Sequence, residues 1–172
     1  MHIHKFERFW IVLSLILIAG FIGTVVIGFT LYDLKVIGES EQVDPTDLSD
    51  TRFANPGVYK DKTNGVAEYH VYVVARQFLY MPGTGNPIKV PAGKRITFHV
   101  TAPDVLHGFH VVGTNINTMA IPGQVATLTT VFPEPKEYGI LCNEYCGAAH
   151  HAMEGVLEVV PQSQFNEKML VQ

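Results

Sequence analysis

Ile96-Thr-Phe-His-Val-Thr101 alternates apolar and polar side chains at every position. Successive side chains of a β-strand point to opposite faces of the sheet, so this alternation indicates a strand with one buried face. The segment 125–132 repeats the pattern, and further short apolar runs occur at 69–75, 138–141 and 156–160. These segments predict a domain built from short β-strands.

Residues with turn chemistry separate these runs, at Pro82-Gly83, Pro91-Ala-Gly93, Pro122-Gly123, Pro133 and Pro135. Many short strands with regular breaks are typical of an antiparallel sandwich or barrel. No long helical period follows residue 68, and about 105 residues are enough for such a domain to have its own core. The sequence therefore predicts an all-β domain over residues 68–172.

The N-terminal part has a different pattern, because Trp10–Tyr32 contains no charged residue. As a helix this segment is about 35 Å long, which is enough to cross the hydrocarbon core of a membrane. A cleaved signal peptide is the alternative, but its apolar region usually has only about 7–15 residues. We expect a cytoplasmic stub and one transmembrane helix in residues 1–34, followed by a turn-rich linker in residues 35–67.

The charges around this segment favour one orientation. Lys5 and Arg8 precede it and acidic residues dominate after it, so the N-terminus is predicted in the cytoplasm and the β-domain outside it. The formal net charge of the 172-residue chain is -4, which argues against a nucleic-acid partner.

The chemistry of the chain is concentrated in two segments. The first reads Cys142-Asn-Glu-Tyr-Cys146-Gly-Ala-Ala-His150-His151-Ala-Met153 and contains the two cysteines of the chain. The second reads Asp104-Val-Leu-His107-Gly-Phe-His110. Thiolate and thioether are soft ligands and imidazole is intermediate, a combination that suits copper. With two cysteines, two sulfurs could bridge two copper ions.

Other readings of these residues are possible. Cys142 and Cys146 could form a disulfide, which an extracytoplasmic compartment permits. Zinc could also bind two cysteines and two histidines tetrahedrally. Met153 argues against zinc, for which a thioether is a poor ligand. The spacing alone does not decide between His150 and His151.

The pattern Cys-x3-Cys-x3-His-x2-Met with an upstream histidine resembles the CuA motif of cytochrome c oxidase subunit II. Residues 104–110 and Gly113-Thr-Asn-Ile-Asn117, together with a single membrane helix, are similar to the B-type oxidases. The resemblance covers the membrane segment and residues 68–160. It implies a cupredoxin-like Greek-key β-barrel or sandwich that holds a binuclear copper centre. Carried over position by position, it implies one set of copper ligands: His107, Cys142, Cys146, His150, Met153 and the backbone carbonyl of Glu144.

The resemblance also implies a role in respiration. The chain would accept electrons from a cytochrome c or a small copper protein and pass them to haem in subunit I. There oxygen is reduced to water, coupled to proton pumping, so the chain itself would transfer electrons without doing the oxygen chemistry. The implied location is a prokaryotic cell membrane. In some relatives a glutamate at the position of Glu144 also reaches magnesium at the junction with subunit I.

One feature departs from the family pattern. A-type relatives have a tryptophan-rich segment where electrons arrive, whereas Trp10 is the one tryptophan of this chain. The matching stretch is 75–80, where Phe78 or Tyr80 could lie near that point, although core packing is the simpler expectation for both.

Two other functions fit parts of the pattern. The copper-bearing subunit of a nitric oxide reductase would have nearly the same sequence and differ in its partner subunit. A membrane-anchored copper chaperone of thioredoxin type also combines a single anchor, two nearby cysteines and a distant histidine. Its cysteines, however, would lie at the start of a helix within βαβ units, which this β-rich pattern does not predict.

Overall fold

The computed structural model describes residues 4–31, 41–63 and 66–171. The chain divides into two compact units, residues 1–39 and residues 40–172.

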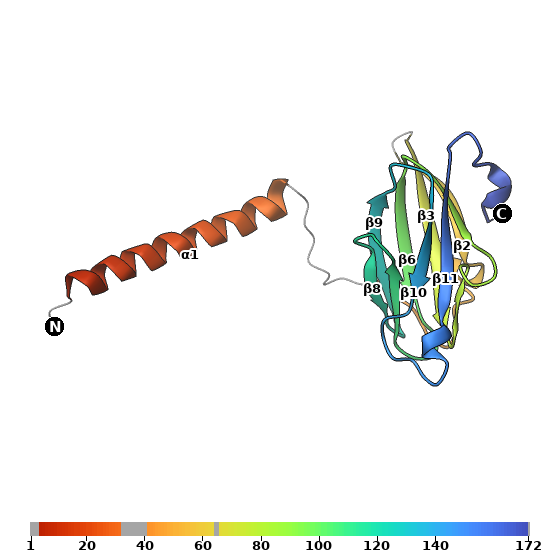
Figure 1. The fold of residues 1–172 in the computed structure, drawn as a ribbon, viewed down its shortest axis with the longest axis horizontal. Helices are drawn as coiled ribbons and strands as arrows, with labels where there is room; N and C mark the ends of the chain where they lie inside the picture. Colours follow the sequence, from red (N-terminus) through yellow and green to blue (C-terminus); the bar gives the residue numbers. More distant parts are fainter. Residues whose placement is uncertain (1–3, 32–40, 64–65, 172) are drawn as a thin grey trace. The chain divides into compact units, whose positions relative to one another are not determined.

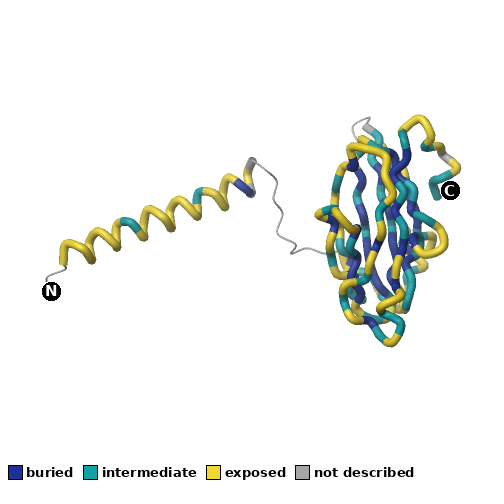
Figure 2. Tube along the Cα trace, viewed as in Figure 1, coloured by how far each residue is buried: buried dark blue, intermediate teal, exposed yellow. Residues whose placement is uncertain are grey.

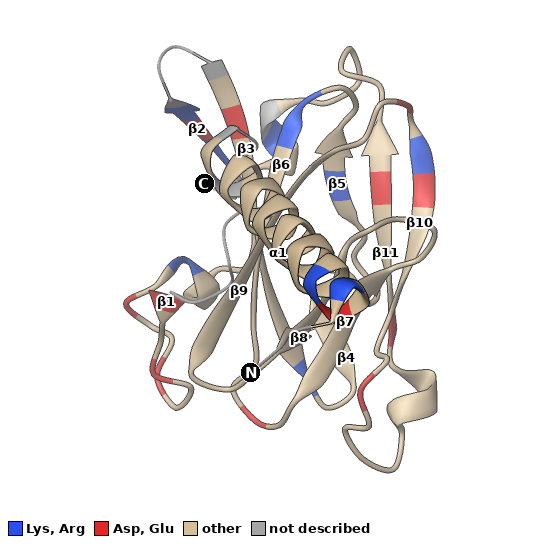
Figure 3. Ribbon diagram, turned by 90° about the vertical axis from the view of Figure 1, so that its left-hand side faces the viewer, with Lys and Arg blue, Asp and Glu red and all other residues tan. Residues whose placement is uncertain are grey.

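The first unit contains one helix, α1 (Lys5–Leu31), which begins at its charged end. Lys5, Glu7 and Arg8 are its charged residues, and the rest of the helix has none (Figure 3). Its 27 residues correspond to about 40 Å. Nearly all its described side chains are exposed (Figure 2), and residues 5–28 are long and apolar enough to cross a membrane. The predicted helix is confirmed, while residues 1–3 and 32–40 lie outside the described residues.

The second unit is a two-layered β-structure (Figure 1). In its described residues the strands are β1 (Glu41–Gln42), β2 (Gly57–Thr63), β3 (Val66–Arg76), β4 (Leu79–Met81), β5 (Ile88–Pro91), β6 (Arg95–Thr101), β7 (His107–Val111), β8 (Asn117–Ala120), β9 (Gln124–Val131), β10 (Lys136–Leu141) and β11 (Glu154–Val160). Single turns of 3₁₀ helix are η1 (Arg52–Ala54), η2 (His150–Ala152) and η3 (Glu167–Met169). The five strands expected from the sequence correspond to β3, β6, β9, β10 and β11.

One sheet has the order β1-β9-β6-β3-β2, with β4 also pairing with β3, and the other has the order β5-β11-β10-β7-β8. The predicted all-β sandwich is confirmed, but two pairs of its strands, β3 with β6 and β5 with β11, are parallel, which the antiparallel expectation did not include. The chain leaves β3 for the opposite sheet, forms β5 there, and returns to place β6 beside β3. Crossing between layers makes such neighbours parallel, whereas a hairpin makes them antiparallel.

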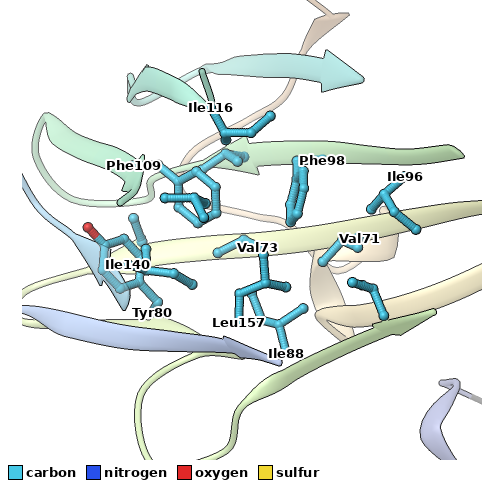
Figure 4. Close-up of a cluster of buried hydrophobic side chains, with 14 of the residues drawn as sticks. Val71, Val73, Tyr80, Ile88, Ile96, Phe98, Phe109, Ile116, Ile140 and Leu157 are labelled. Atoms are coloured by element: carbon cyan, nitrogen blue, oxygen red, sulfur yellow. The ribbon is translucent and has the colours of Figure 1, made fainter. Parts of the chain in front are cut away.

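The core lies between the two sheets and is filled by large apolar side chains (Figure 4). Phe98 and Phe109 pack with ring centroids 5.7 Å apart and are fully buried. Each fully buried aliphatic or aromatic side chain contributes about 1.5–3 kcal/mol relative to an exposed one. Cys146 and Met153 belong to the same buried cluster, so the rigid core extends directly into the segment with the predicted ligands.

The predicted linker, residues 35–67, needs a correction. Residues 35–40 lie outside the described part, but β1, η1 and β2 lie within 41–63 and belong to the β-domain. β2 is an edge strand on which Lys60, Asp61 and Lys62 follow one another, so its apolar signal is weak. The turn at Asp44 is real, since its carboxylate accepts the N–H of Thr46 at 2.8 Å.

Candidate metal centre

Two segments meet at one end of the sandwich, the lower end in Figure 1. One is the loop from β10 to β11, which contains both cysteines, and the other leads into β7. Leu141, at the end of β10, pairs with His110 of β7. This register places Cys142 beside Gly108, whose N–H lies 3.4 Å from the Cys142 sulfur. Strand pairing therefore brings residues 34 positions apart to one place.

The two cysteine sulfurs lie 3.8 Å apart. A disulfide bond is about 2.05 Å long, so Cys142 and Cys146 are free thiols in this structure. Metal–thiolate bonds are about 2.3 Å, as measured for zinc, and two sulfurs at 3.8 Å can therefore reach one ion or share two. The separation fits a metal site better than a cystine.

His107 supplies the third donor. Its ring is fully buried, and its Nε2 lies 2.9 Å from the Oδ1 atom of Asp104. Its Nδ1 is buried and has no hydrogen-bond partner among the described residues. Donor atoms of His107, Cys142 and Cys146 all lie within 4.8 Å of one another. An unpaired buried nitrogen costs about 1–3 kcal/mol, so this nitrogen beside two thiols fits a bound metal.

Asp104 fixes which nitrogen of His107 is available. Its carboxylate accepts the N–H of Gln77 at 2.8 Å and the N–H of Val105 at 2.7 Å. Burial raises the pKa of Asp104, but these two bonds and the bond with His107 outweigh it and hold the pKa below its ordinary value. Because an ionised carboxylate only accepts, Nε2 of His107 must carry a proton and Nδ1 can keep its lone pair.

His150 and Met153 both lie next to the sulfur of Cys146. His150 Nδ1 is 3.6 Å and Met153 Sδ is 3.7 Å from the sulfur of Cys146. The short helix η2 sets their spacing, because the N–H of His150 bonds to Gly147 and the N–H of Met153 bonds to His150. His150 and Met153 are separated by two residues, and this helical turn brings the imidazole of one and the thioether of the other to the same sulfur.

The backbone carbonyl of Glu144 lies 3.2 Å from the sulfur of Cys142, at the position expected for a main-chain ligand. His151 is exposed and His110 is half-buried, and in the described residues neither makes a hydrogen bond to either sulfur. The structure thus brings all six predicted ligand residues together and leaves these two histidines outside.

The two thiols differ in burial, since Cys146 is buried and Cys142 is half-buried. Burial, followed by the neighbouring Cys142, raises the pKa of Cys146 to about 11. A metal-free Cys146 is therefore a protonated thiol at neutral pH, and binding a metal must displace that proton. The buried thioether of Met153 at this site favours a soft metal such as copper over zinc.

Sequence reasoning missed three residues that support the ligands. Asp104 stood inside a quoted motif without a role, and Gln77 was not considered. Tyr80 was expected in the core or near the point of electron arrival. It is fully buried, and its hydroxyl donates to the carbonyl of Gly108 at 2.5 Å. Burial first, and then the two thiols, raise the pKa of Tyr80 above its ordinary value. The spacing Asp-x2-His was the one available signal.

Three comparisons bear on identity. The family described as "Cytochrome C oxidase subunit II, periplasmic domain" matches residues 58–160. The chain is 42% identical to cytochrome c oxidase subunit 2 of Thermus thermophilus over 157 residues, which cover 90% of this chain and 91% of that protein.

Solved structures agree. A chain of a heme-copper terminal oxidase dimer superposes with a TM-score of 0.66 at 31% identity, covering 91% of this chain and all of that chain. The periplasmic domain of subunit II of cytochrome oxidase from Bradyrhizobium japonicum has a TM-score of 0.52 at 21% identity, covering 55% and 86% respectively, a likeness of fold alone. A thioredoxin-type chaperone is incompatible with this β-structure, because the loop with both cysteines joins two antiparallel strands of one sheet. The fold is cupredoxin-like, and the chain belongs to the cytochrome c oxidase subunit II family.

Proposed function

We propose that this chain is the electron-accepting subunit of a haem-copper terminal oxidase and holds a binuclear copper centre. Cys142 and Cys146 would hold the two ions with their thiolates, and His107 and His150 would each provide an imidazole. Met153 and the carbonyl of Glu144 complete the set. The observation that carries the proposal is the Nδ1 of buried His107, which has no hydrogen-bond partner within the described part of the chain and lies beside two thiols 3.8 Å apart.

When bound, two copper ions that share two thiolates supply a one-electron relay with the charge spread over both metals. The chain's own residues prepare the place for it. Asp104 holds the His107 ring so that Nδ1 faces the thiols. The buried sulfur of Cys146 and the thioether of Met153 exclude water from one side. Such fixed, dry surroundings reduce reorganisation when the charge of a site changes.

The proposed partners follow from the family. The subunit receives electrons from a cytochrome c or a small copper protein and delivers them to haem in subunit I, where oxygen is reduced to water and protons are pumped. Helix α1 anchors it in a prokaryotic cell membrane, with the N-terminus in the cytoplasm and the copper domain outside. The positive charges at Lys5 and Arg8 support that orientation.

The rim of the site supports a weakly bound protein donor. Leu106, Met119, Leu141 and Tyr145 are exposed by 36%, 47%, 43% and 80%. Three of them neighbour a predicted ligand in sequence, and Met119 pairs with Gly108. Apolar groups around a redox centre suit small, transient contacts that form and dissociate quickly.

We also propose that the carboxylate of Glu144 binds magnesium at the junction with subunit I. The main-chain oxygen and the carboxylate are separate ligands, so one residue can serve a soft and a hard metal. Its carbonyl lies at the Cys142 sulfur, which leaves the carboxylate available.

The test is to load the full chain with copper in detergent and to measure copper content and paramagnetic resonance. We expect two copper ions per chain and a multi-line hyperfine pattern from an electron shared by two nuclei. Cys146→Ser should abolish that pattern, because one bridge is lost. His150→Gln should also abolish it, whereas His151→Gln, its matched control, should leave it unchanged. A wild-type chain with one copper, or equal effects of the two histidine variants, would contradict the proposal.

A further inference from the structure

Gln77 contacts both segments that carry the ligands. Its backbone N–H donates to Asp104 Oδ2 at 2.8 Å, and Asp104 in turn bonds to His107. Its side-chain amide donates from Nε2 to the carbonyl of Cys146 at 2.5 Å. One residue thus links the segment before β7 with the cysteine loop, although these lie 27 and 69 positions away in sequence.

We propose that Gln77 is a positioning residue that fixes the Cys146 turn relative to the His107 side of the copper site, an inference that rests on the proposed function. Gln77 touches none of the reacting atoms. It acts through the carbonyl of Cys146 and through the Asp104 carboxylate.

Gln77 is suited to this role because it lies in a short turn between two paired strands. Arg76 pairs with Leu79, so Gln77 and Phe78 form the two-residue connection between β3 and β4. β3 is paired on both sides, with β2 and with β6. A donor on such a short, well-supported turn is held in place with little freedom, as the support of a metal site requires.

The Cys146 turn fits closely against this connection. Gly147 has φ +135°, a conformation that side chains rarely adopt. A Cβ at this position would lie 2.9 Å from Nε2 of Gln77 and 3.1 Å from the ring of Phe78. The turn therefore approaches Gln77 as closely as a residue without a side chain allows, and the hydrogen bond fixes it there.

The role of the side chain can be separated from that of the backbone. Gln77→Leu removes the amide donor and keeps the backbone N–H, so the Asp104–His107 pair stays anchored. Gln77 is exposed, and we expect this variant to fold with unchanged strand content. Loss of an outer support of a metal site typically weakens metal binding by about 10–100-fold.

The experiment uses the full chain in detergent, loaded with copper. We expect Gln77→Leu to transfer copper to a chelator about tenfold faster than wild type and to show altered hyperfine splitting. Gln162→Leu, the same change on an exposed turn after the far end of β11, should match wild type in both measurements.

The possible results distinguish a failure of the proposed function from a failure of the inference about Gln77. A wild-type chain that takes up no copper pair overturns the proposed function itself. A wild-type chain with two copper ions, combined with a Gln77→Leu variant of unchanged release rate and spectrum, overturns the inference alone. If Gln77→Leu does not fold, Gln77→Glu replaces it, because an ionised carboxylate of equal length cannot donate either.

Discussion

At the scale of single residues, the two ring nitrogens of His107 have different roles. Asp104 determines the proton on one ring nitrogen, and the other nitrogen is buried with no hydrogen-bond partner in residues 4–31, 41–63 and 66–171. The sequence indicated His107 as a ligand, but an aspartate in a turn is usually a solvated residue. Its role became visible only through the distance between the two side chains.

Gly108 provides the residue-scale prediction. A Cβ at this position would lie 1.9 Å from Oδ1 and 2.6 Å from the backbone nitrogen of Asn143. Backbone cannot move away cheaply, so Gly108→Ala should lower the free energy of unfolding of the metal-free protein by about 1–3 kcal/mol. Denaturant-induced unfolding of the variant and of wild type measures this difference in the free energy of unfolding.

Gly139→Ala is the matched control, because its Cβ would meet only Val112 at 3.9 Å, an ordinary contact. It should change the free energy of unfolding by less than about 1 kcal/mol. Equal unfolding midpoints for the two variants would show that the β7 segment and the cysteine loop are not in contact as described.

At the scale of elements, the parallel pairing of β3 with β6 places two histidines together on one face of the sheet. His70 Nδ1 lies 3.0 Å from His99 Nε2, and His99 stacks on Tyr72 with ring centroids 4.5 Å apart. Asp61 on β2 lies 3.9 Å from His70, and Thr127 on β9 lies 3.4 Å from His99. Hydrogen bonds therefore join β3, β6 and β9, and a longer charge contact reaches Asp61 on β2.

This cluster predicts a pH dependence of stability. Burial first, then the charges of His70 and Arg52, lower the pKa of His99 to about 4, against an opposing effect of Asp61. The unfolded chain binds a proton near pH 6.5, so His99 contributes its full stability above that pH and loses it as the pH falls toward 4. Because His99 is partly exposed, we expect a loss of about 1–2 kcal/mol.

Thermal unfolding of wild type and His99→Gln between pH 7 and pH 4 measures this loss. Glutamine is a polar side chain of similar size that does not titrate. The stability of the variant should therefore fall less than that of wild type between pH 7 and pH 4. Parallel curves for the two proteins would show that His99 does not titrate differently on folding.

At the scale of the whole molecule, the chain divides into a helix and a β-domain that has its own core. The buried cluster contains residues from Val58 to Val159 and none from α1. A fragment of residues 40–172 should therefore fold without detergent, with β-rich circular dichroism and one cooperative thermal transition.

The same fragment should bind copper with the spectrum of the full chain, because every predicted ligand lies within it. The control is the fragment with Cys146→Ser, which should fold but lack that spectrum. Aggregation or a missing thermal transition in both fragments would mean that the domain depends on residues 1–39.

The sequence by itself determined the apolar helix, the β-class of the domain and the ligand residue types, because alternation, length and ligand chemistry are local properties. Strands such as Ile96–Thr101 were found since each has one buried face. The edge strand β2 and the parallel pairs were missed, because they depend on which strands become neighbours after the chain crosses between sheets. Only the tertiary structure showed that Gln77 joins Asp104 to the cysteine loop, since hydrogen bonds between distant segments leave no periodic signal in the sequence.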